Sequence, residues 1–330
     1  MEDKTPLSDK VDRDPSAAET GAAANPANDS ASNAVLVGGE APPSEAESQL
    51  AIRAGESAAP LHEGQLERDG LALLPTAPRS PQPVEWRGLD VALFLAFSLV
   101  WLLVSQFLSL AAYAVLRPLM GWHTPPMALA ENAIFVVATQ LVFYAPVLVY
   151  IILVVVLQYH QPFGVGIRWR WPAFGPGVRL LLAGVLLAMV VLAGSALLPD
   201  RKDFPMEKLF ASPSAVYAVG GLAVLVAPFM EELVFRGVLF SFFERLGGFR
   251  VAVPATAVLF AAMHYPEYAG AWTHVFMILV VGLVLSVARA STGSLVPSFL
   301  LHTAYNATFI GLLFLGTHGF KNLHGIAGAP

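Results

Sequence analysis

The 330-residue chain contains no cysteine, and only 13% of its residues are charged. An ordinary soluble domain has about 25% charged residues. The lack of cysteine excludes a disulfide framework, thiolate catalysis, and zinc or iron–sulfur sites held by cysteine. The scarcity of charge, with 56% hydrophobic residues and a mean hydropathy of +0.62, excludes an ordinary soluble enzyme and indicates a polytopic membrane protein.

Basic residues are scarce in the first quarter of the chain. Residues 1–85 hold 15 acidic against 6 basic side chains, whereas residues 86–330 carry a net charge of +4. The first segment is rich in Ala, Pro and Ser, has no sustained apolar periodicity, and lacks the basic start and apolar run of a signal peptide. We expect a disordered acidic tail. Since the basic excess lies in the hydrophobic part, no nucleic-acid partner is expected.

Long apolar runs begin at Trp86. A helix of about 20 apolar residues is needed to cross a bilayer core of about 30 Å. The sequence therefore predicts an all-α membrane protein, a bundle of about seven transmembrane helices, with an eighth only if one of the longer runs is broken. The expected spans are residues 91–116, 134–157, 178–198, 215–240, 251–264, 272–288 and 295–315. The expected organisation is a tail (1–85), N-terminal transmembrane helices (86–200), a transmembrane core (214–316) and a short C-terminal tail (317–330).

The distribution of basic residues between the connecting segments predicts the orientation. With the N-terminus inside, the inner segments hold eight Lys or Arg residues and the outer segments hold five. An excess of basic residues is typical of cytoplasmic loops. We therefore expect a multi-pass protein with a cytoplasmic N-terminus, and the Ala- and Pro-rich composition favours the bacterial cytoplasmic membrane.

Three charged side chains lie together inside the fourth expected span: Glu231, Glu232 and Arg236. Each such group costs about 2.5–3.5 kcal/mol at the centre of a membrane helix, so a function is the first hypothesis. Glu232 and Arg236 are spaced i, i+4 and can pair on one face, while Glu231 points about 100° away. The alternative is a buried ion pair with one spare, protonated glutamate.

Two further spans carry polar residues at a similar depth. His264 ends the fifth expected span, and His302 and Asn306 share one face of the seventh. Counted from the loops at one membrane face, Glu231, His264 and His302 lie at depths of roughly 15, 21 and 12 Å. A single membrane histidine is more often a packing residue than a catalyst. Polar residues from three spans at one depth favour a common site, on the cytoplasmic side by the orientation above.

These residue types suit hydrolysis of a peptide bond. A glutamate and a histidine beside one water act as general bases, and His302 with Asn306 supplies donors for a tetrahedral oxyanion. Glu231, His264 and His302 also form a candidate zinc set with one open position, although no His-Glu-x-x-His motif is present. Because the two histidines differ in expected depth by about 9 Å, we favour a water activated without an obligatory metal.

The three motifs together resemble the CPBP family of intramembrane endopeptidases. They are Glu231-Glu232-x-x-x-Arg236, Phe260-x-x-x-His264 and His302-x-x-x-Asn306, within residues 215–315. This family includes CAAX prenyl proteases and bacteriocin-processing or self-immunity proteins. The resemblance implies an α-helical protease with a water-filled cavity open to the cytosol or bilayer. In it, Glu231 and His264 would activate water, and His302 and Asn306 would hold the oxyanion. Arg236 would brace Glu232, and Phe260 would support the site.

The resemblance also implies a membrane-anchored protein or peptide as substrate. Both metal-dependent and glutamate-type mechanisms have been described for the family, so zinc remains an alternative. Some bacterial members resemble myxosortase, which removes C-terminal anchors from exported proteins, and such sorting is an alternative function here.

Two other classes stay open. A proton-coupled transporter also uses membrane carboxylates and histidines, but transporters typically contain internal repeats, and the diacid motif occurs once. A non-catalytic immunity protein would bind a peptide in the same cavity and release it intact. Cleavage that depends on Glu231 separates a protease from both.

Overall fold

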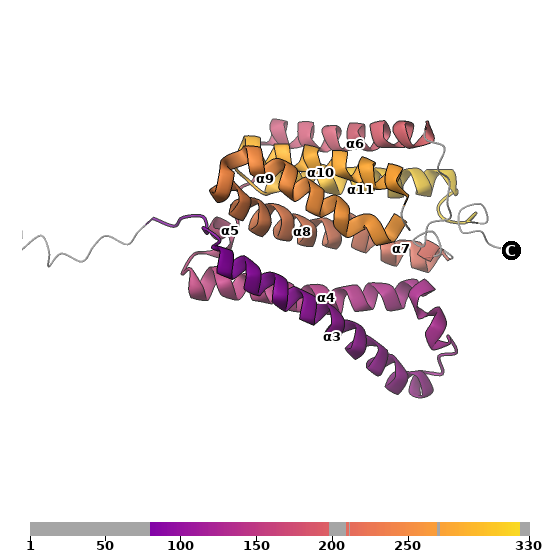
Figure 1. The fold of residues 1–330 in the computed structure, drawn as a ribbon. Helices are drawn as coiled ribbons and strands as arrows, with labels where there is room; N and C mark the ends of the chain where they lie inside the picture. Colours follow the sequence, from indigo (N-terminus) through magenta and orange to yellow (C-terminus); the bar gives the residue numbers. More distant parts are fainter. Residues whose placement is uncertain (1–79, 198–208, 211, 269–270, 324–330) are drawn as a thin grey trace, which may run out of the picture. The chain divides into compact units, whose positions relative to one another are not determined.

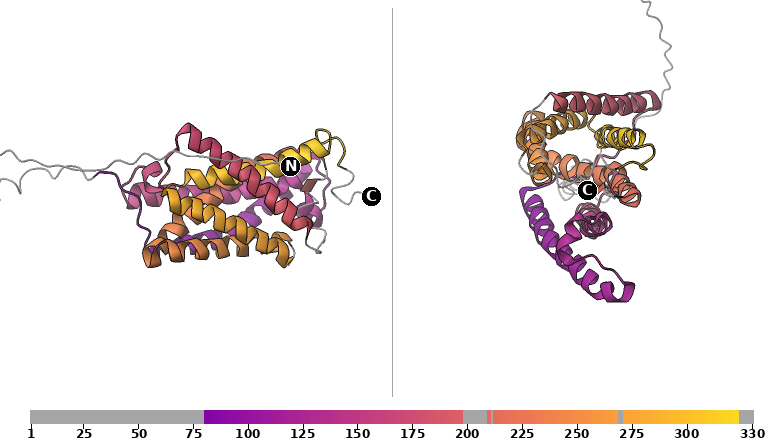
Figure 2. Two further views of the ribbon diagram at one scale, coloured as in Figure 1. Left: turned by 90° about the horizontal axis from the view of Figure 1, so that it is seen from above. Right: turned by 90° about the vertical axis from the view of Figure 1, so that its right-hand side faces the viewer.

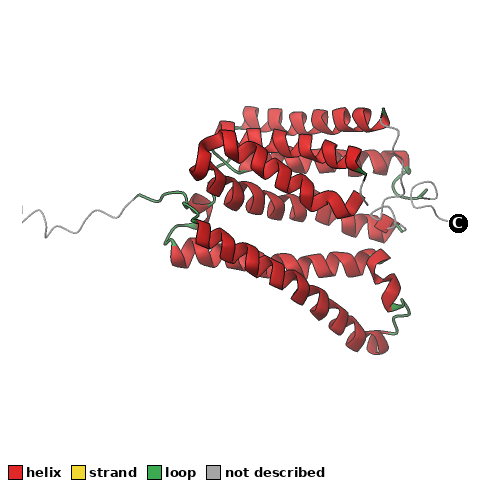
Figure 3. Cartoon of the chain, viewed as in Figure 1, coloured by secondary structure: helices red, strands yellow, loops and turns green. Residues whose placement is uncertain are grey.

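The computed structural model describes residues 80–197, 209–210, 212–268 and 271–323. Figure 3 shows helices joined by turns, and the described residues contain no strand. The chain divides into two units, and all described residues belong to the second, Ala77–Pro330. The all-α expectation is thereby confirmed, whereas the expected tail, apart from its last residues, lies outside the described residues.

The helices follow one another with short connections. The first half contains α3 (Gly88–Met120), η1 (Pro126–Glu131), α4 (Ala133–Leu153), η2 (Val154–Gln158), α5 (Phe163–Gly166) and α6 (Phe174–Ala196). The second half contains α7 (Pro213–Gly221), η4 (Leu222–Val226), α8 (Ala227–Glu232), η5 (Leu233–Leu239), α9 (Phe240–His264), η6 (Tyr265–Tyr268), α10 (Trp272–Thr292) and α11 (Val296–Gly316). The segments η2, η4 and η5 are π-helical turns that continue the neighbouring α-helices.

Six helical segments of the described chain are long and apolar enough to cross a membrane, so the protein is an integral multi-pass membrane protein. One of them, Pro213–Tyr268, is 56 residues long and contains both the fourth and the fifth expected span. Gly247 and Gly248 depart from helical geometry, and Gly248 has a φ of 64°, which glycine adopts without a steric penalty. The chain turns back at this point (Figure 1). Pro254 lies inside the returning helix, where it removes one backbone hydrogen bond.

The described chain begins beside the ends of several other helices, and this end of the bundle is here named the proximal end. The Val84 N–H donates to the Gly166 carbonyl after α4, at 3.0 Å. The Arg245 guanidinium at the bend of α9 donates to the Trp86 carbonyl at 2.8 Å. The Leu295 N–H before α11 donates to the Arg168 carbonyl at 3.0 Å. The end of α4, α5, the bend of α9 and the start of α11 therefore meet where α3 begins.

The opposite end, named the distal end, contains the remaining helix ends. Ala133 at the start of α4 packs with Ala215 and Val219 of α7. The rings of Tyr265 after α9 and Trp272 at the start of α10 lie 5.0 Å apart. Figure 2 shows the helices of the second half running between these two ends.

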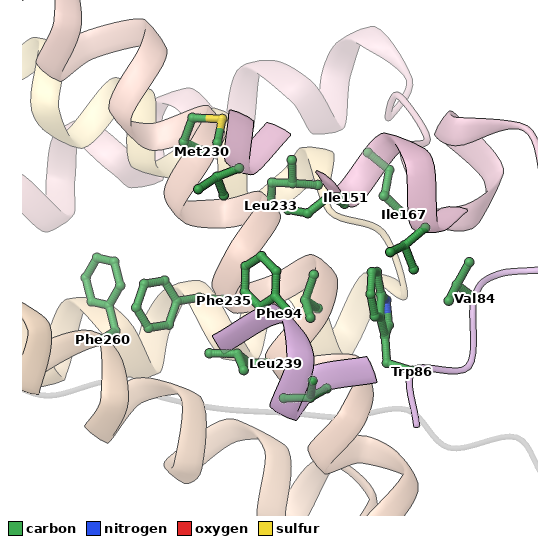
Figure 4. Close-up of a cluster of buried hydrophobic side chains, with 14 of the residues drawn as sticks. Val84, Trp86, Phe94, Ile151, Ile167, Met230, Leu233, Phe235, Leu239 and Phe260 are labelled. Atoms are coloured by element: carbon green, nitrogen blue, oxygen red, sulfur yellow. The ribbon is translucent and has the colours of Figure 1, made fainter. Parts of the chain in front are cut away.

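Between the two ends, neighbouring helices pack closely against one another. Helix α9 packs along α10, and α11 packs along α6. A Cβ on Gly184 of α6 would lie 2.4 Å from the Leu301 carbonyl oxygen of α11, so only glycine permits this approach. The largest apolar cluster joins α3, α4, η5 and α9, and Figure 4 shows Phe94, Phe235 and Phe260 among its members.

Candidate active site

Glu231 and Glu232 end the short helix α8, which lies between the π-helical turns η4 and η5. Such turns are frequent at functional sites because they redirect side chains within a continuous helix. The side chain of Glu231 is 19% exposed and lines a cavity, whereas the side chain of Glu232 is completely buried. The two adjacent carboxylates therefore face different environments, as the helical geometry of the sequence predicts.

The buried carboxylate of Glu232 is the centre of a polar network. Its Oε1 accepts a hydrogen bond from Nη1 of Arg236 at 3.0 Å and another from Nδ1 of His302 at 2.9 Å. The other Nη of Arg236 donates to the Gly282 carbonyl of α10 at 3.0 Å, and its guanidinium lies 4.5 Å from the centre of the Phe260 ring. This network connects α8, η5, α9, α10 and α11 without exposing an ion to solvent.

His302 is oriented by Glu232. A carboxylate oxygen accepts, so Nδ1 of the ring carries the proton of the 2.9 Å bond. The other nitrogen, Nε2, then faces Oε2 of Glu231 at 3.7 Å, longer than a direct hydrogen bond. The sequence paired Glu232 with Arg236 and missed its bond to His302. No local spacing could reveal it, because these two residues are 70 positions apart.

His264 is oriented in the same way by a backbone group. Its Nδ1 donates to the Phe260 carbonyl at 2.7 Å, which leaves Nε2 as the unprotonated nitrogen of the neutral ring. The Phe260 ring contacts the rings of both His264 and His302, at 4.5 and 5.8 Å between centroids. Phe260 also packs on Phe235 (Figure 4). The hydrophobic core therefore supports both imidazoles.

Asn306 bonds to a backbone carbonyl of η4 that receives no hydrogen bond within η4. Its Nδ2 donates to the Ala223 carbonyl in η4 at 2.7 Å. In this π-helical turn the Ala227 N–H bonds to the Leu222 carbonyl, and the next residue, Pro228, has no N–H. The Ala223 carbonyl therefore lacks a helical donor, and one N–H of the Asn306 amide takes that place. The second N–H of the same amide is left for another acceptor.

These residues meet at one cavity of about 710 Å³. Glu231, His264, His302 and Asn306 all line it, from α8, α9 and α11. The sequence did not single out the other polar groups of its wall, because they come from elements that carry none of the three motifs. They are Gln140, Tyr144, Ser195, Glu267, Tyr268 and His274.

The zinc alternative has no matching set of ligands in the described part of the chain. No group of three or more His, Cys, Asp or Glu side chains there is arranged so that it could hold a metal ion. Oε2 of Glu231 lies 3.7 Å from Nε2 of His302. The residues as placed do not fit a three-ligand zinc site.

Comparison with known proteins agrees with the motifs. Residues 213–308 match the family model described as type II CAAX prenyl endopeptidase Rce1-like. A curated protein of Escherichia coli, named an uncharacterized 24.3 kDa protein, is 37% identical over 134 residues. That match covers 39% of this chain and 59% of the relative's length. No solved structure matches the chain significantly. The resemblance stated from the three motifs is thus confirmed, because residues 213–308 match the model of the Rce1-like, type II CAAX prenyl endopeptidase family.

Proposed function

We propose that this protein is an intramembrane endopeptidase that hydrolyses a peptide bond of a membrane-anchored protein. The family of residues 213–308 supports a CAAX-type endopeptidase in general. The observation that carries the proposal is the separation of the two neighbouring carboxylates. The carboxylate of Glu232 accepts hydrogen bonds from Arg236 and His302. Glu231 instead lines the cavity, with Oε2 at 3.7 Å from Nε2 of His302.

In the proposed reaction, Glu231 takes a proton from a water molecule, and the resulting hydroxide attacks the carbonyl carbon of the scissile bond. His264 is the second base, because its Nδ1 is occupied by the Phe260 carbonyl and its Nε2 is unprotonated in the neutral ring. When the C–N bond breaks, the proton held by Glu231 passes to the leaving amine. Water is the only co-reactant, and no cofactor is required.

The oxyanion donors are Asn306 and His302. Asn306 contributes the N–H that the Ala223 carbonyl does not use. The Nδ1–H of His302 is bonded to Glu232, so this ring is a donor only when it enters the reaction doubly protonated, with a proton on Nε2 that it keeps throughout. The hydrogen bond and charge of Glu232 stay in place throughout, and its role is therefore to orient His302. Removing one donor of an oxyanion site typically lowers kcat by about 10²–10³-fold.

The test is cleavage that depends on Glu231. The chain is co-expressed with candidate membrane-anchored substrates, and Glu231→Gln is compared with the wild type and with Glu85→Gln. Glu85 is an exposed glutamate at the proximal end, away from the cavity. We expect Glu231→Gln to insert normally and to lose cleavage, because glutamine keeps the shape of the side chain without its basicity. Cleavage by purified Glu231→Gln protein at the wild-type rate would refute the proposal.

We further propose the bacterial cytoplasmic membrane as its location, with the N-terminus in the cytoplasm. The excess of basic residues in the inner segments supports this orientation. Removal of C-terminal anchors from exported proteins is the narrower function that this orientation favours, because the cavity extends toward the distal end.

A further inference from the structure

A second cavity, of about 410 Å³, lies at the proximal end between the start of α6 and the turn that joins α10 to α11. We name it the proximal pocket. Its wall shares no residue with the wall of the catalytic cavity, and all of its lining residues belong to the described part of the chain. The proximal pocket is therefore a separate feature, which the candidate catalytic residues do not explain.

Two segments that are far apart in the sequence form the frame of the proximal pocket. The Leu295 N–H donates to the Arg168 carbonyl at 3.0 Å, and the Ser294 hydroxyl donates to the Arg170 carbonyl at 2.8 Å. The Arg170 N–H in turn donates to Oγ of Ser294 at 3.2 Å. The Arg170 guanidinium also donates to the Gly293 carbonyl at 3.0 Å. Because these bonds join the two segments directly, the pocket is preformed by the fold.

The proximal pocket is lined by two arginines and by no acidic side chain. Arg179 is exposed, and no described residue forms an ion pair or hydrogen bond with its guanidinium. Arg170 uses one Nη for the Gly293 carbonyl, which leaves most of its five N–H donors for another acceptor. Arg168, just outside the pocket, is instead paired with Glu244 at 3.0 Å. The lining charge is therefore +2, which suits an anion with several acceptor oxygens, such as a phosphate.

The remaining wall of the proximal pocket is largely apolar. It consists of Trp171, Pro172, Pro176, Leu180 and Pro297, beside Thr292 and Ser294. The indole of Trp171 is 65% exposed, and Trp is typical of the boundary between membrane and water. A site for a free phosphate has no need of such a wall. A phospholipid carries both a phosphate and an apolar part.

The outward surface of α6 continues from this wall into the membrane-spanning segment. Figure 1 shows α6 at the edge of the bundle. Arg179, Leu182 and Leu186 are spaced i, i+3, i+7 and therefore lie on one face of the helix. Leu182 and Leu186 are 62% and 64% exposed, so this face is open to acyl chains. A guanidinium at the proximal end is thus followed by an apolar strip along the same helix face, which is the order of groups that a phospholipid requires.

We propose that the proximal pocket binds an anionic phospholipid. Arg170 and Arg179 donate to the phosphate oxygens, Trp171 packs against the apolar part next to the phosphate, and one acyl chain follows Leu182 and Leu186 along α6. The pocket lies at the end of the bundle where α3 begins, which the proposed orientation places in the cytoplasm. The cytoplasmic leaflet carries anionic lipids that attract basic residues. This site does not depend on the proposed protease function.

A lipid in the proximal pocket contacts the helix that carries part of the candidate active site. Pro297, in the first turn of α11, belongs to the pocket wall, and His302 follows five residues later. The opposite wall belongs to α6 and the segment before it. Because the ligand touches both helices and binds only the folded protein, it should stabilise their contact.

Arg179→Gln gives the sharpest test, since Arg179 bonds to no described residue and its loss should leave the fold intact. The full-length protein in uncharged detergent is titrated with dioctanoyl phosphatidylglycerol, and the dissociation constant is measured by calorimetry. Arg250→Gln is the matched control, because Arg250 is an exposed arginine at the proximal end outside the pocket. We expect Arg179→Gln to weaken binding about fivefold, as for one basic residue beside an anionic lipid. Arg179→Lys should recover most of the affinity, and Arg250→Gln should bind like the wild type.

Equal affinity of Arg179→Gln and the wild type would overturn the site, and so would equal weakening by Arg250→Gln. Two further ligands separate the lipid from its parts. Dioctanoyl phosphatidylcholine has the same chains without net charge, and glycerol phosphate has the charge without the chains. We expect both to bind at least fivefold more weakly than phosphatidylglycerol. Phosphatidylcholine of equal affinity would show that the anion is not recognised. Glycerol phosphate of equal affinity would show a site for free phosphate. Either result would overturn the proposal.

Thermal unfolding gives a second measurement. Saturating phosphatidylglycerol should raise the melting temperature of the wild type and of Arg250→Gln, and raise that of Arg170→Gln/Arg179→Gln much less. An unchanged melting temperature of the wild type would overturn the site, because a ligand of the folded state must stabilise it. Glu231→Gln should bind the lipid like the wild type. A protein that cleaves nothing but binds the lipid as expected would refute only the protease, and the reverse result would refute only the lipid site.

Discussion

The proximal and distal halves of this bundle use polar side chains for opposite purposes. At the level of Glu232 and Arg236, every charge is buried and bonded across several helices. One residue earlier in the chain, Glu231 faces a cavity of about 710 Å³ whose polar groups are partly exposed. The comparison shows how a membrane protein places reactive groups in an apolar medium. A buried layer in which Glu232 bonds to Arg236 and His302 joins the helices, and the neighbouring side chains can then remain available for chemistry.

The largest effect on stability is expected in the buried layer. Arg236→Met leaves the carboxylate of Glu232 buried without its cation, which should cost about 3–5 kcal/mol of unfolding free energy. The double variant Glu232→Gln/Arg236→Met should recover part of that loss, because no unpaired charge remains. Thermal unfolding in detergent measures both. A single variant as stable as the wild type would show that the layer does not hold the bundle.

A smaller effect is expected where α6 contacts α11. Gly184→Ala places a Cβ 2.4 Å from the Leu301 carbonyl oxygen, and the overpacking should cost about 1–3 kcal/mol. Gly175→Ala is the matched control on the same helix, because nothing lies within 4 Å of its added Cβ. The two melting temperatures in detergent should differ, with Gly184→Ala the lower. Equal melting temperatures would mean that the helices can separate without cost.

Asn306 belongs to both sides of this comparison, because it bonds a buried carbonyl and is also a proposed oxyanion donor. Asn306→Ala removes the donor to the buried Ala223 carbonyl, a loss of about 1–3 kcal/mol, and also removes an oxyanion donor. Adding Pro228→Ala supplies a backbone N–H near that carbonyl. We expect the double variant to regain stability, measured by thermal unfolding, but not cleavage. If cleavage returns together with stability, Asn306 acts only on the backbone.

The smallest effect is expected from metal removal. A strong chelator should leave most of the proteolytic activity of the purified protein intact, because the described residues offer no three-ligand set for a metal ion. Activity is measured before and after chelation and again after addition of zinc. Loss on chelation with recovery on zinc addition would reverse this expectation and assign Glu231, His264 and His302 a metal-binding role.

Most of the correct predictions about the helices and the candidate site came from helical periodicity. It placed the expected spans in helices, apart from single end residues of two of them, as far as these spans are described. It also paired Glu232 with Arg236 and turned Glu231 away from that pair. The count of spans was harder, because the fourth and fifth expected spans form one 56-residue helical segment in which two glycines make the turn. Glycine pairs occur in many loops, and their φ angles depend on the packing around them.

The sequence by itself determined the membrane class, the helical fold and the residues that belong to one polar site. Long apolar runs and i, i+4 spacings are local properties, so they can be read along the chain. Only the tertiary structure decided which groups those residues bond. The Glu232–His302 bond and the capture of the Ala223 carbonyl by Asn306 join positions 70 and 83 residues apart. It also decided that the cavity extends toward the distal end, because a cavity is bounded by side chains from several helices whose packing no single segment encodes.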